Sequence, residues 1–402
     1  MSSISIRLLS SGNGLPWDRL IDLVGADAGC LPRVALRDRI AVIRVDQLPA
    51  PAASILKQCM LAGGADALVH REVLTCRVQE SRAIIYGTPA TLLRGCDSLD
   101  GQPFGLGLLA GRIRNCLNED ARPVYLEVNN RKLEYSNIPL IMGILNITPD
   151  SFSDGGTFSS SEEAARRAVE MESAGAAIID IGGESTRPGS RAVSSEEQIE
   201  RVIPVIHAIR KVSQVPISVD TCLPDVAESA IEAGAGMINS IDGLETPGMA
   251  DLAVSLKIPV VIMHKRGIPE TMQIDPGYRD APEEVGNYLL SRVEALVEAG
   301  LSRDLIIVDP GIGFGKRLKD NLAVIRSLER LGHLTGCRVL LGHSRKSFLG
   351  EITGIHPAGN RDAVSHAVTV LSKGADMVRV HDVEGTVATM QVADAIQTGR
   401  IL

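Results

Sequence analysis

Short aliphatic runs recur along most of the chain, and each is followed by a segment with helical periodicity. Runs such as AAIIDIG, VPISVD and KIPVVIMH are nearly continuous in apolar residues, as expected of parallel strands covered on both faces. The segments 162–174, 196–212 and 282–299 repeat apolar residues at the spacing of a helix. Counted from position 138, eight strand-then-helix units predict a (β/α)8 barrel of the α/β class.

The predicted strands end near eight positions, most of them polar: Asn146, Gly182, Asp220, Ser240, His264, Asp309, His343 and His381. Gly-Ala pairs at 175–176, 234–235 and 374–375 fit helices that close with a glycine before the next strand. In a parallel barrel the carboxyl ends of all strands meet at one rim, and this rim carries the chemistry of the fold. The functional residues are therefore expected in and after these strand ends.

Residues 1–118 are expected to form a separate, small α/β domain whose role the sequence does not indicate. Within it, 55–69 predicts a helix, a glycine turn and a strand, and 81–87 predicts another strand. Residues 122–402 are expected to hold the barrel, preceded by two strands around Asn129 and Asn130. Asparagine tolerates the positive φ of a tight turn, so this stretch predicts a β-hairpin that plugs the barrel floor.

Composition narrows the class of protein. The chain has 402 residues, of which 45% are hydrophobic and 22% charged, enough for a barrel and a further domain. A net charge of −8 argues against a general nucleic-acid binder. Seven cysteines without a Cys-x-x-Cys pair indicate reduced thiols, and neither a signal-peptide pattern nor a membrane-spanning apolar stretch is present. We expect a cytoplasmic protein with small-molecule substrates and no nucleic-acid or membrane partner.

The polar residues at the strand ends form a set that can recognise a flat heterocycle. Asp220 and Asp309 can accept hydrogen bonds from amino and ring N–H groups, Asn239 can accept and donate, and Lys346 can donate to a carbonyl. Arg345, Arg379, His381 and the loop after Asn146 offer donors for an anion such as pyrophosphate. Asp154 could add a hard oxygen ligand for Mg²⁺, which takes few protein ligands and shares phosphate oxygens.

Simpler explanations stand beside this one. Asp220 could cap the next helix, and His264 is explained equally well as a hydrogen-bonded core histidine. The loop cations Lys265, Arg266 and Lys316 could be solvated charges. Lys346, by contrast, opens a predicted helix, where a cation opposes the helix dipole, and this misfit favours a functional role.

Seven segments, in order and at barrel spacing, resemble the dihydropteroate synthase family: LNITPDSFSDGG, DIGGESTRPG, SVDT, MHKRGIPETMQ, DPGIGFGK, SRKSF and VRVHDV. The resemblance begins near residue 123 and leaves the N-terminal region outside. It implies a transferase of folate biosynthesis, the target of sulfonamides, that acts as a homodimer. The implied reaction condenses 6-hydroxymethyl-7,8-dihydropterin pyrophosphate with p-aminobenzoate in an SN1-like displacement, giving 7,8-dihydropteroate and pyrophosphate.

The resemblance also implies roles for individual residues. Pterin binding is implied for Asp220, Asn239, Met263, Asp309, Phe314 and Lys346. Of these, Asp220, Asp309 and Lys346 are expected to be catalytic. Pyrophosphate binding is implied for Asn146, Arg379 and His381, with Mg²⁺ near Asn146 and Asp154. The p-aminobenzoate site is implied for Phe152, Thr186, Arg187, Pro188 and Ser344.

Two positions depart from the family pattern. Ser240 stands where the family usually has aspartate, and His343 stands where many members have a small residue. The sequence Asn-Ser-Ile at 239–241 is similar to pterin-binding methyltransferases, which pass a methyl group from methyltetrahydrofolate to a corrinoid protein. That activity is one alternative, and a pterin-binding protein without catalysis is another.

Overall fold

The computed structural model describes residues 27, 29, 37, 40–75, 77–117, 122–147, 157–184, 193–267 and 276–398, with the backbone alone at 157–160. The predicted site residues Phe152, Asp154, Thr186, Arg187 and Pro188 lie outside this part of the chain. The chain divides into two compact units, Met1–Ala121 and Arg122–Leu402.

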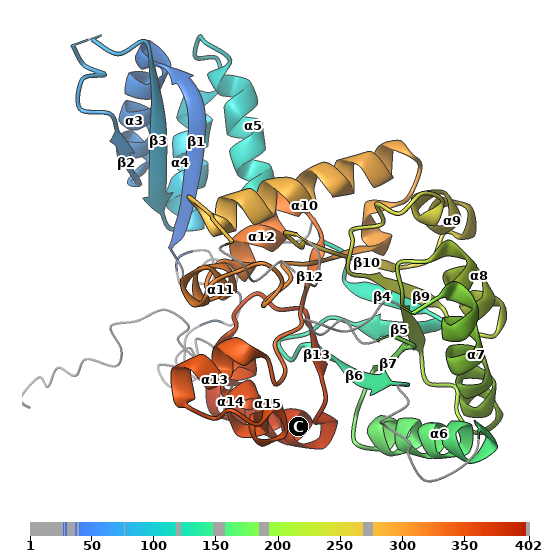
Figure 1. Cartoon of the computed structure of the whole chain (residues 1–402). Coiled ribbons are helices and arrows are strands. Elements are labelled where there is room, and N and C mark those ends of the chain that lie inside the picture. The colour runs from blue at the N-terminus through green and yellow to red at the C-terminus, as the bar shows by residue number, and fades with distance from the viewer. Residues whose placement is uncertain are drawn as a thin grey trace, which may run out of the picture. The chain divides into compact units, whose positions relative to one another are not determined.

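The first unit is a small α/β domain. Its elements are β1 (Ala41–Pro49), α3 (Ala50–Gly63), β2 (Asp66–Val69), β3 (Glu80–Gly87), α4 (Pro89–Leu99) and α5 (Leu106–Leu117). The strands form an antiparallel sheet in the order β1-β3-β2 (Figure 1). The predicted helix, glycine turn and strand are present, and Gly64 makes the turn at φ 82°, a region that glycine enters without steric cost.

The domain has its own hydrophobic core. On β3 the side chains of Ala83 and Ile85 alternate with more exposed neighbours, so one face of the sheet is buried. Leu56 and Met60 of α3 and Leu92 of α4 are fully buried in the same core. The unit therefore buries enough apolar surface to be a domain in its own right.

The second unit is a closed barrel of eight parallel strands. The strands are β6 (Leu140–Asn146), β7 (Ile178–Gly182), β8 (Ile217–Asp220), β9 (Met237–Ser240), β10 (Val260–Met263), β11 (Ile306–Asp309), β12 (Arg338–Leu341) and β13 (Met377–Val380). The helices are α6 (Thr157–Ser173), α7 (Ser195–Val212), α8 (Pro224–Glu232), α9 (Met249–Leu256), α10 (Ala281–Glu298), α11 (Leu318–Ile325), α12 (Leu328–Thr335), α13 (Ser347–Thr353), α14 (Asp362–Leu371) and α15 (Val383–Thr398), with short 3₁₀ turns η4 (Arg303–Leu305) and η5 (Ala358–Asn360). Figure 1 shows these helices outside the strands.

The barrel confirms the predicted fold class, and every strand ends within two residues of its predicted position. The glycines expected to close helices before strands, Gly175, Gly234 and Gly374, all have positive φ. Among the described residues, no helix combines the length and the apolar character that crossing a bilayer would require.

A β-hairpin precedes the barrel. Strands β4 (Tyr125–Val128) and β5 (Arg131–Glu134) pair antiparallel through Asn129 and Asn130, whose φ values of 50° and 61° are those of a type I′ turn. Leu126 and Val128 are buried in one cluster with inward-facing side chains of seven barrel strands. The Oδ1 atom of Asn129 accepts hydrogen bonds from the backbone N–H of Ile217 and from Arg210. The hairpin thus fills the N-terminal end of the barrel.

Candidate active site

The inward face of the barrel changes from apolar to polar over two residues. On four strands the apolar floor side chain is followed two residues later by a polar one: Ile178 by Asp180, Met237 by Asn239, Ile307 by Asp309 and Met377 by Arg379. Because side chains two apart on a strand share a face, these groups lie one layer above the floor, at the carboxyl ends of the strands. With Asp220, at the end of β8, and Lys346, after β12, they are called here the rim cluster: Asp180, Asp220, Asn239, Asp309, Lys346 and Arg379.

Arg379 lies between two carboxylates of the rim cluster. Its Nε donates to Oδ2 of Asp180 at 2.6 Å, and its Nη2 donates to Oδ2 of Asp220 at 2.7 Å. Although burial opposes the charge, the two carboxylates hold the pKa of Arg379 above its usual value. Burial raises the pKa of Asp220 to about 7, against the influence of Arg379. One positive charge is therefore shared by two buried acids.

Asp180 was not among the residues predicted from the sequence. It lies inside β7 with no exposed surface, and its Oδ2 also accepts from Nδ2 of Asn239 at 3.0 Å. The sequence carried a signal for it, since an aspartate among the isoleucines of IIDIG must either be paired or face a polar cavity. The helix-capping explanation of Asp220 is wrong, because the N-cap of α8 is Leu223.

Lys346 and Asp309 meet at the loop after β11. Lys346 donates through Nζ to the carbonyl oxygen of Ile312, and its Nζ lies 4.1 Å from the ring centroid of Phe314. Oδ1 of Asp309 accepts from the backbone N–H of Gly311 at 2.7 Å. Burial lowers the pKa of Lys346 to about 8 and raises that of Asp309, although the attraction between the two charges opposes both shifts. Asp309 lies in register with Met263 of β10.

Lys316 is a buried residue of the same loop, so the solvated explanation is wrong for it. Its Nζ lies 2.9 Å from Nδ1 of His264 and donates to the carbonyl oxygens of Gly311, at 2.8 Å, and Phe314, at 3.2 Å. Burial lowers the pKa of Lys316 to about 7, and burial together with Lys316 lowers that of His264 to about 3. His264 is thus a neutral core histidine that accepts from lysine and supports the loop.

The neighbouring loop cations differ from Lys316. Lys265 is half-buried. Arg266 forms an ion pair with Glu284 at 2.8 Å and lies 4.0 Å from the ring centroid of Tyr278. Arg266 is therefore held by its own loop and by α10 rather than free in solvent.

The SRK segment after β12 supplies further groups to the rim. Oγ of Ser344 lies 3.0 Å from Nδ1 of His381 and accepts from the backbone N–H of His381 at 3.2 Å. Arg345 instead forms a two-pronged ion pair with Asp362 at 2.6 and 2.7 Å. Arg345 therefore fixes α14 to this segment, while Ser344 and His381 stay together beside the barrel mouth.

Both departures from the family pattern have local partners. Ser240 donates to Oδ1 of Asp242 at 2.5 Å, and Asp242 also accepts from the side chain of Thr246 at 2.6 Å. Although burial opposes them, these hydrogen bonds lower the pKa of Asp242, so a carboxylate remains near the end of β9. His343 is fully buried, and its Nε2 lies 2.9 Å from the carbonyl oxygen of Ser365, so it ties β12 to α14.

Of the two residues expected near Mg²⁺, Asn146 lies in the part of the chain that the structure describes and Asp154 does not. The register of β6, β7, β8 and β9 aligns Asn146, Gly182, Asp220 and Asn239 at one level of the rim. Its amide oxygen is a hard ligand of the type Mg²⁺ accepts. Among the described residues, no group of three or more His, Cys, Asp or Glu side chains could hold a metal ion.

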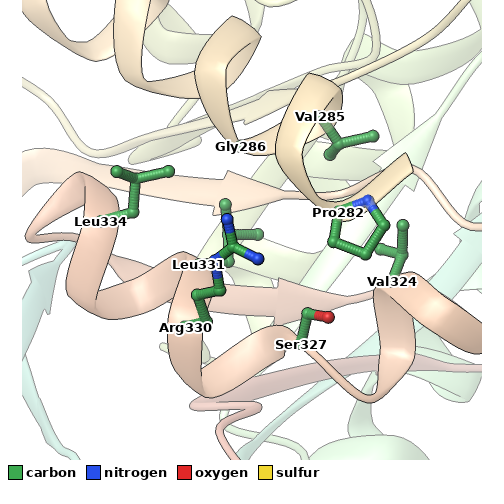
Figure 2. A pocket seen from close by; sticks show the side chains of 8 residues that line it. All are labelled: Pro282, Val285, Gly286, Val324, Ser327, Arg330, Leu331 and Leu334. Atoms are coloured by element: carbon green, nitrogen blue, oxygen red, sulfur yellow. The ribbon is translucent and has the colours of Figure 1, made fainter. Parts of the chain in front are cut away.

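A pocket lies between α10, α11 and α12 (Figure 2). It is lined by Pro282, Val285, Gly286, Val324, Ser327, Arg330, Leu331 and Leu334. These eight residues, all in the described part of the chain, include none of the candidate site residues. The chemistry is therefore assigned to the barrel mouth.

Comparisons with known proteins agree with this geometry. A match to the family of pterin binding enzymes covers residues 142–381. The chain is 43% identical over 258 residues to dihydropteroate synthase of Escherichia coli (strain K12), which covers 64% of this chain and 91% of that protein. It is 46% identical over 266 residues to dihydropteroate synthase of Bacillus subtilis (strain 168), with 66% and 90% covered.

A solved structure of dihydropteroate synthase from Xanthomonas albilineans in complex with 7,8-dihydropteroate is 41% identical and superposes with a TM-score of 0.62. The match covers 68% of this chain and 98% of that one. These findings confirm the resemblance carried by the seven sequence segments, and the chain therefore belongs to the pterin-binding enzymes, within the dihydropteroate synthase family.

Proposed function

We propose that the chain condenses 6-hydroxymethyl-7,8-dihydropterin pyrophosphate with p-aminobenzoate, and that four residues of the rim cluster hold the pterin: Asp220, Asn239, Asp309 and Lys346. The observation that carries the proposal is the meeting of acids, amide and lysine from β8, β9, β11 and the segment after β12 at one barrel mouth. Such a mouth binds a bicyclic ring in preference to a flexible chain, since its donors and acceptors come from rigid strands.

Pterin recognition follows from the charge of each group. The carboxylates of Asp220 and Asp309 accept from the amino and ring N–H groups, and the ammonium group of Lys346 donates to the ring carbonyl or a ring nitrogen. Met263 and Phe314 supply apolar contact to the ring faces. Because the site is largely closed to water, each of these contacts is stronger than it would be in solution.

Bond breaking is assigned to the groups around the diphosphate. The bond between the exocyclic carbon and the phosphate oxygen breaks, the electron pair leaves with pyrophosphate, and Arg379, His381 and Asn146 stabilise that anion. Asn146 and Asp154 would hold Mg²⁺, which would neutralise part of the same charge when bound. Asp309 provides a negative counter-charge to the cation that develops on the dihydropterin.

The second substrate enters above the pterin. Ser344 is assigned to p-aminobenzoate with Phe152, Thr186, Arg187 and Pro188. The amine nitrogen attacks the exocyclic carbon, a C–N bond forms, and the nitrogen loses one proton. No side chain forms a covalent intermediate, so catalysis rests on position and on the field of the rim cluster, in an SN1-like displacement.

One assay tests the reaction. Purified protein, pterin pyrophosphate, Mg²⁺ and labelled p-aminobenzoate should yield labelled dihydropteroate and an equal amount of pyrophosphate. Pterin binding without pyrophosphate release would contradict the reaction and favour a non-catalytic binding protein. Transfer of a methyl group from methyltetrahydrofolate to a corrinoid protein, in place of condensation, would contradict it in favour of the methyltransferase alternative.

We further propose a homodimer that works in the cytoplasm. The dimer is what the family resemblance implies, and the free cysteines Cys59, Cys96, Cys116, Cys222 and Cys337 fit a reducing compartment. Light scattering after size exclusion should give twice the mass of one chain, and a monomer at working concentration would contradict the dimer.

A further inference from the structure

Asp180 is the most deeply buried acid of the rim cluster, and its partners have different tasks. Its Oδ2 accepts from Nδ2 of Asn239 at 3.0 Å and from Nε of Arg379 at 2.6 Å. Its side chain has no exposed surface, and its Oδ1 has no hydrogen-bond partner in the described part of the chain. One carboxylate oxygen thus connects the residue assigned to the pterin with the residue assigned to pyrophosphate.

The bond to Asn239 determines which end of the amide faces the substrate. An ionised carboxylate can only accept hydrogen bonds, so Asn239 must turn its NH₂ group toward Asp180. Its carbonyl oxygen is then directed away from Asp180 and is available as an acceptor for an N–H group of the ligand. If residue 180 were neutral and able to donate a hydrogen bond, the amide of Asn239 could rotate and present its NH₂ group to the ligand instead of its carbonyl oxygen.

The bond to Arg379 fixes the plane of the guanidinium. Asp180 holds Nε and Asp220 holds Nη2, so two nitrogens of the planar group are anchored to two neighbouring strands, β7 and β8. A guanidinium held at two points has little rotational freedom left to lose when it binds an anion. Among the hydrogen bonds of the described residues, loss of Asp180 leaves Arg379 with the one to Asp220.

We propose that Asp180 is a positioning residue that orients Asn239 toward the pterin and Arg379 toward the pyrophosphate, and so couples the two binding sites. It does so through other residues and without contacting the reacting atoms. This inference rests on the proposed function, since it assigns Asn239 and Arg379 to the two parts of one substrate. It predicts that one conservative change on β7 weakens two chemically different ligands.

The test compares Asp180→Asn with a matched control on the next strand. Ser218 lies opposite Asp180 in the register of β8, is equally buried, and its hydroxyl has no partner among the described residues. Ser218→Ala therefore removes a polar group from the same layer without removing a hydrogen bond of the rim cluster. Two dissociation constants are measured for the folded proteins by calorimetry: one for 6-hydroxymethyl-7,8-dihydropterin, which lacks the diphosphate, and one for inorganic pyrophosphate with Mg²⁺.

Asp180→Asn should weaken each ligand about tenfold or more, the effect of losing one charge-assisted hydrogen bond, while Ser218→Ala keeps wild-type values. In combination with Asn239→Ala, Asp180→Asn should cost pterin affinity little more, because both changes remove the same contact. Asp180→Ser, which is smaller and keeps an acceptor oxygen, makes the same test should the asparagine variant not fold.

If Asp180 had only a structural role, Asp180→Asn would lower the melting temperature and leave both dissociation constants of the folded protein unchanged. Unchanged affinity for either ligand in a folded variant overturns the proposal. Turnover of the wild type is measured first. If the wild type makes no dihydropteroate, the proposed function is wrong. If the wild type is active and the Asp180 variant keeps its affinity for either ligand, only this inference is wrong.

Discussion

At the scale of single residues, burial moves the pKa values of two side chains of the rim cluster toward neutral pH. The pKa of Asp220 is raised to about 7 and that of Lys346 is lowered to about 8, in both cases because the charged form loses its hydration. Pterin binding needs the carboxylate ionised as acceptor and the amine protonated as donor. The two requirements overlap only between these pKa values.

The affinity for diphosphate-free hydroxymethyldihydropterin should therefore pass through a maximum with pH. It should rise as Asp220 loses its proton near pH 7 and fall as Lys346 loses its proton near pH 8. Calorimetric titration at a series of pH values measures it, and this ligand avoids the titration of the phosphates. An affinity that stays constant through the neutral range would show that one of the two charges is not used.

Replacement of Lys346 tests the donor directly. Lys346→Ala removes the ammonium group, the cation that acts most strongly on Asp309, so kcat/KM should fall by about a hundredfold, or about 3 kcal/mol of transition-state stabilisation. Lys373→Ala, at an exposed position in the turn before β13, is the control and should keep wild-type kinetics. Equal rates in both variants would remove Lys346 from the site.

At the scale of elements, the sequence predicted the barrel strands well and the contacts between them poorly. Apolar runs marked the strands, and the acids and amides at their ends marked the rim. The sharing of Arg379 by Asp180 and Asp220 could not be predicted, because it depends on which side chains face each other across a closed barrel. Burial of Lys316 was missed for a similar reason, since its partners are backbone carbonyl oxygens that no motif reveals.

The loop after β11 needs glycine where it approaches the loop after β10 closely, and Gly311 is the tightest of these positions. Gly311 has φ 66°, and a Cβ there would lie 1.9 Å from the carbonyl oxygen of His264. Gly311→Ala must therefore displace the loop that carries Phe314 and contacts Lys346, so pterin affinity should fall by at least tenfold.

Gly354→Ala is the matched control for that loop. Gly354 also has positive φ, at 74°, but open space surrounds its Cβ position, so only the backbone strain of about 1 kcal/mol should appear in a thermal melt. Pterin affinity measured on both variants separates the two effects. A Gly311→Ala protein that binds pterin as well as Gly354→Ala would mean that the loop does not form the site.

At the scale of the whole molecule, the two units have separate hydrophobic cores. The core of the first unit is built from β1–β3 and α3–α5, and the barrel has one core outside its strands and one inside. The family match begins at residue 142 and ends at residue 381, so it lies within the second unit. The sequence indicated a domain boundary between residues 118 and 122, just before the hairpin that precedes the first barrel strand. It gave no role for the first unit.

Removal of residues 1–121 should leave a folded and active barrel. The cut keeps Arg122, which pairs with Asp376 at 3.3 Å, and Pro123, whose carbonyl oxygen accepts from Arg338 at 2.8 Å, so the hairpin stays attached to the floor. We expect wild-type KM values for both substrates and a cooperative thermal melt.

Removal of residues 1–136 is the informative comparison, because it also deletes Leu126 and Val128 and opens the buried floor to water. That longer deletion should unfold or aggregate, since a barrel cannot leave a cluster of apolar side chains exposed at one end. If the shorter deletion aggregates as well, the first unit covers apolar barrel surface, and its role is to stabilise the enzyme.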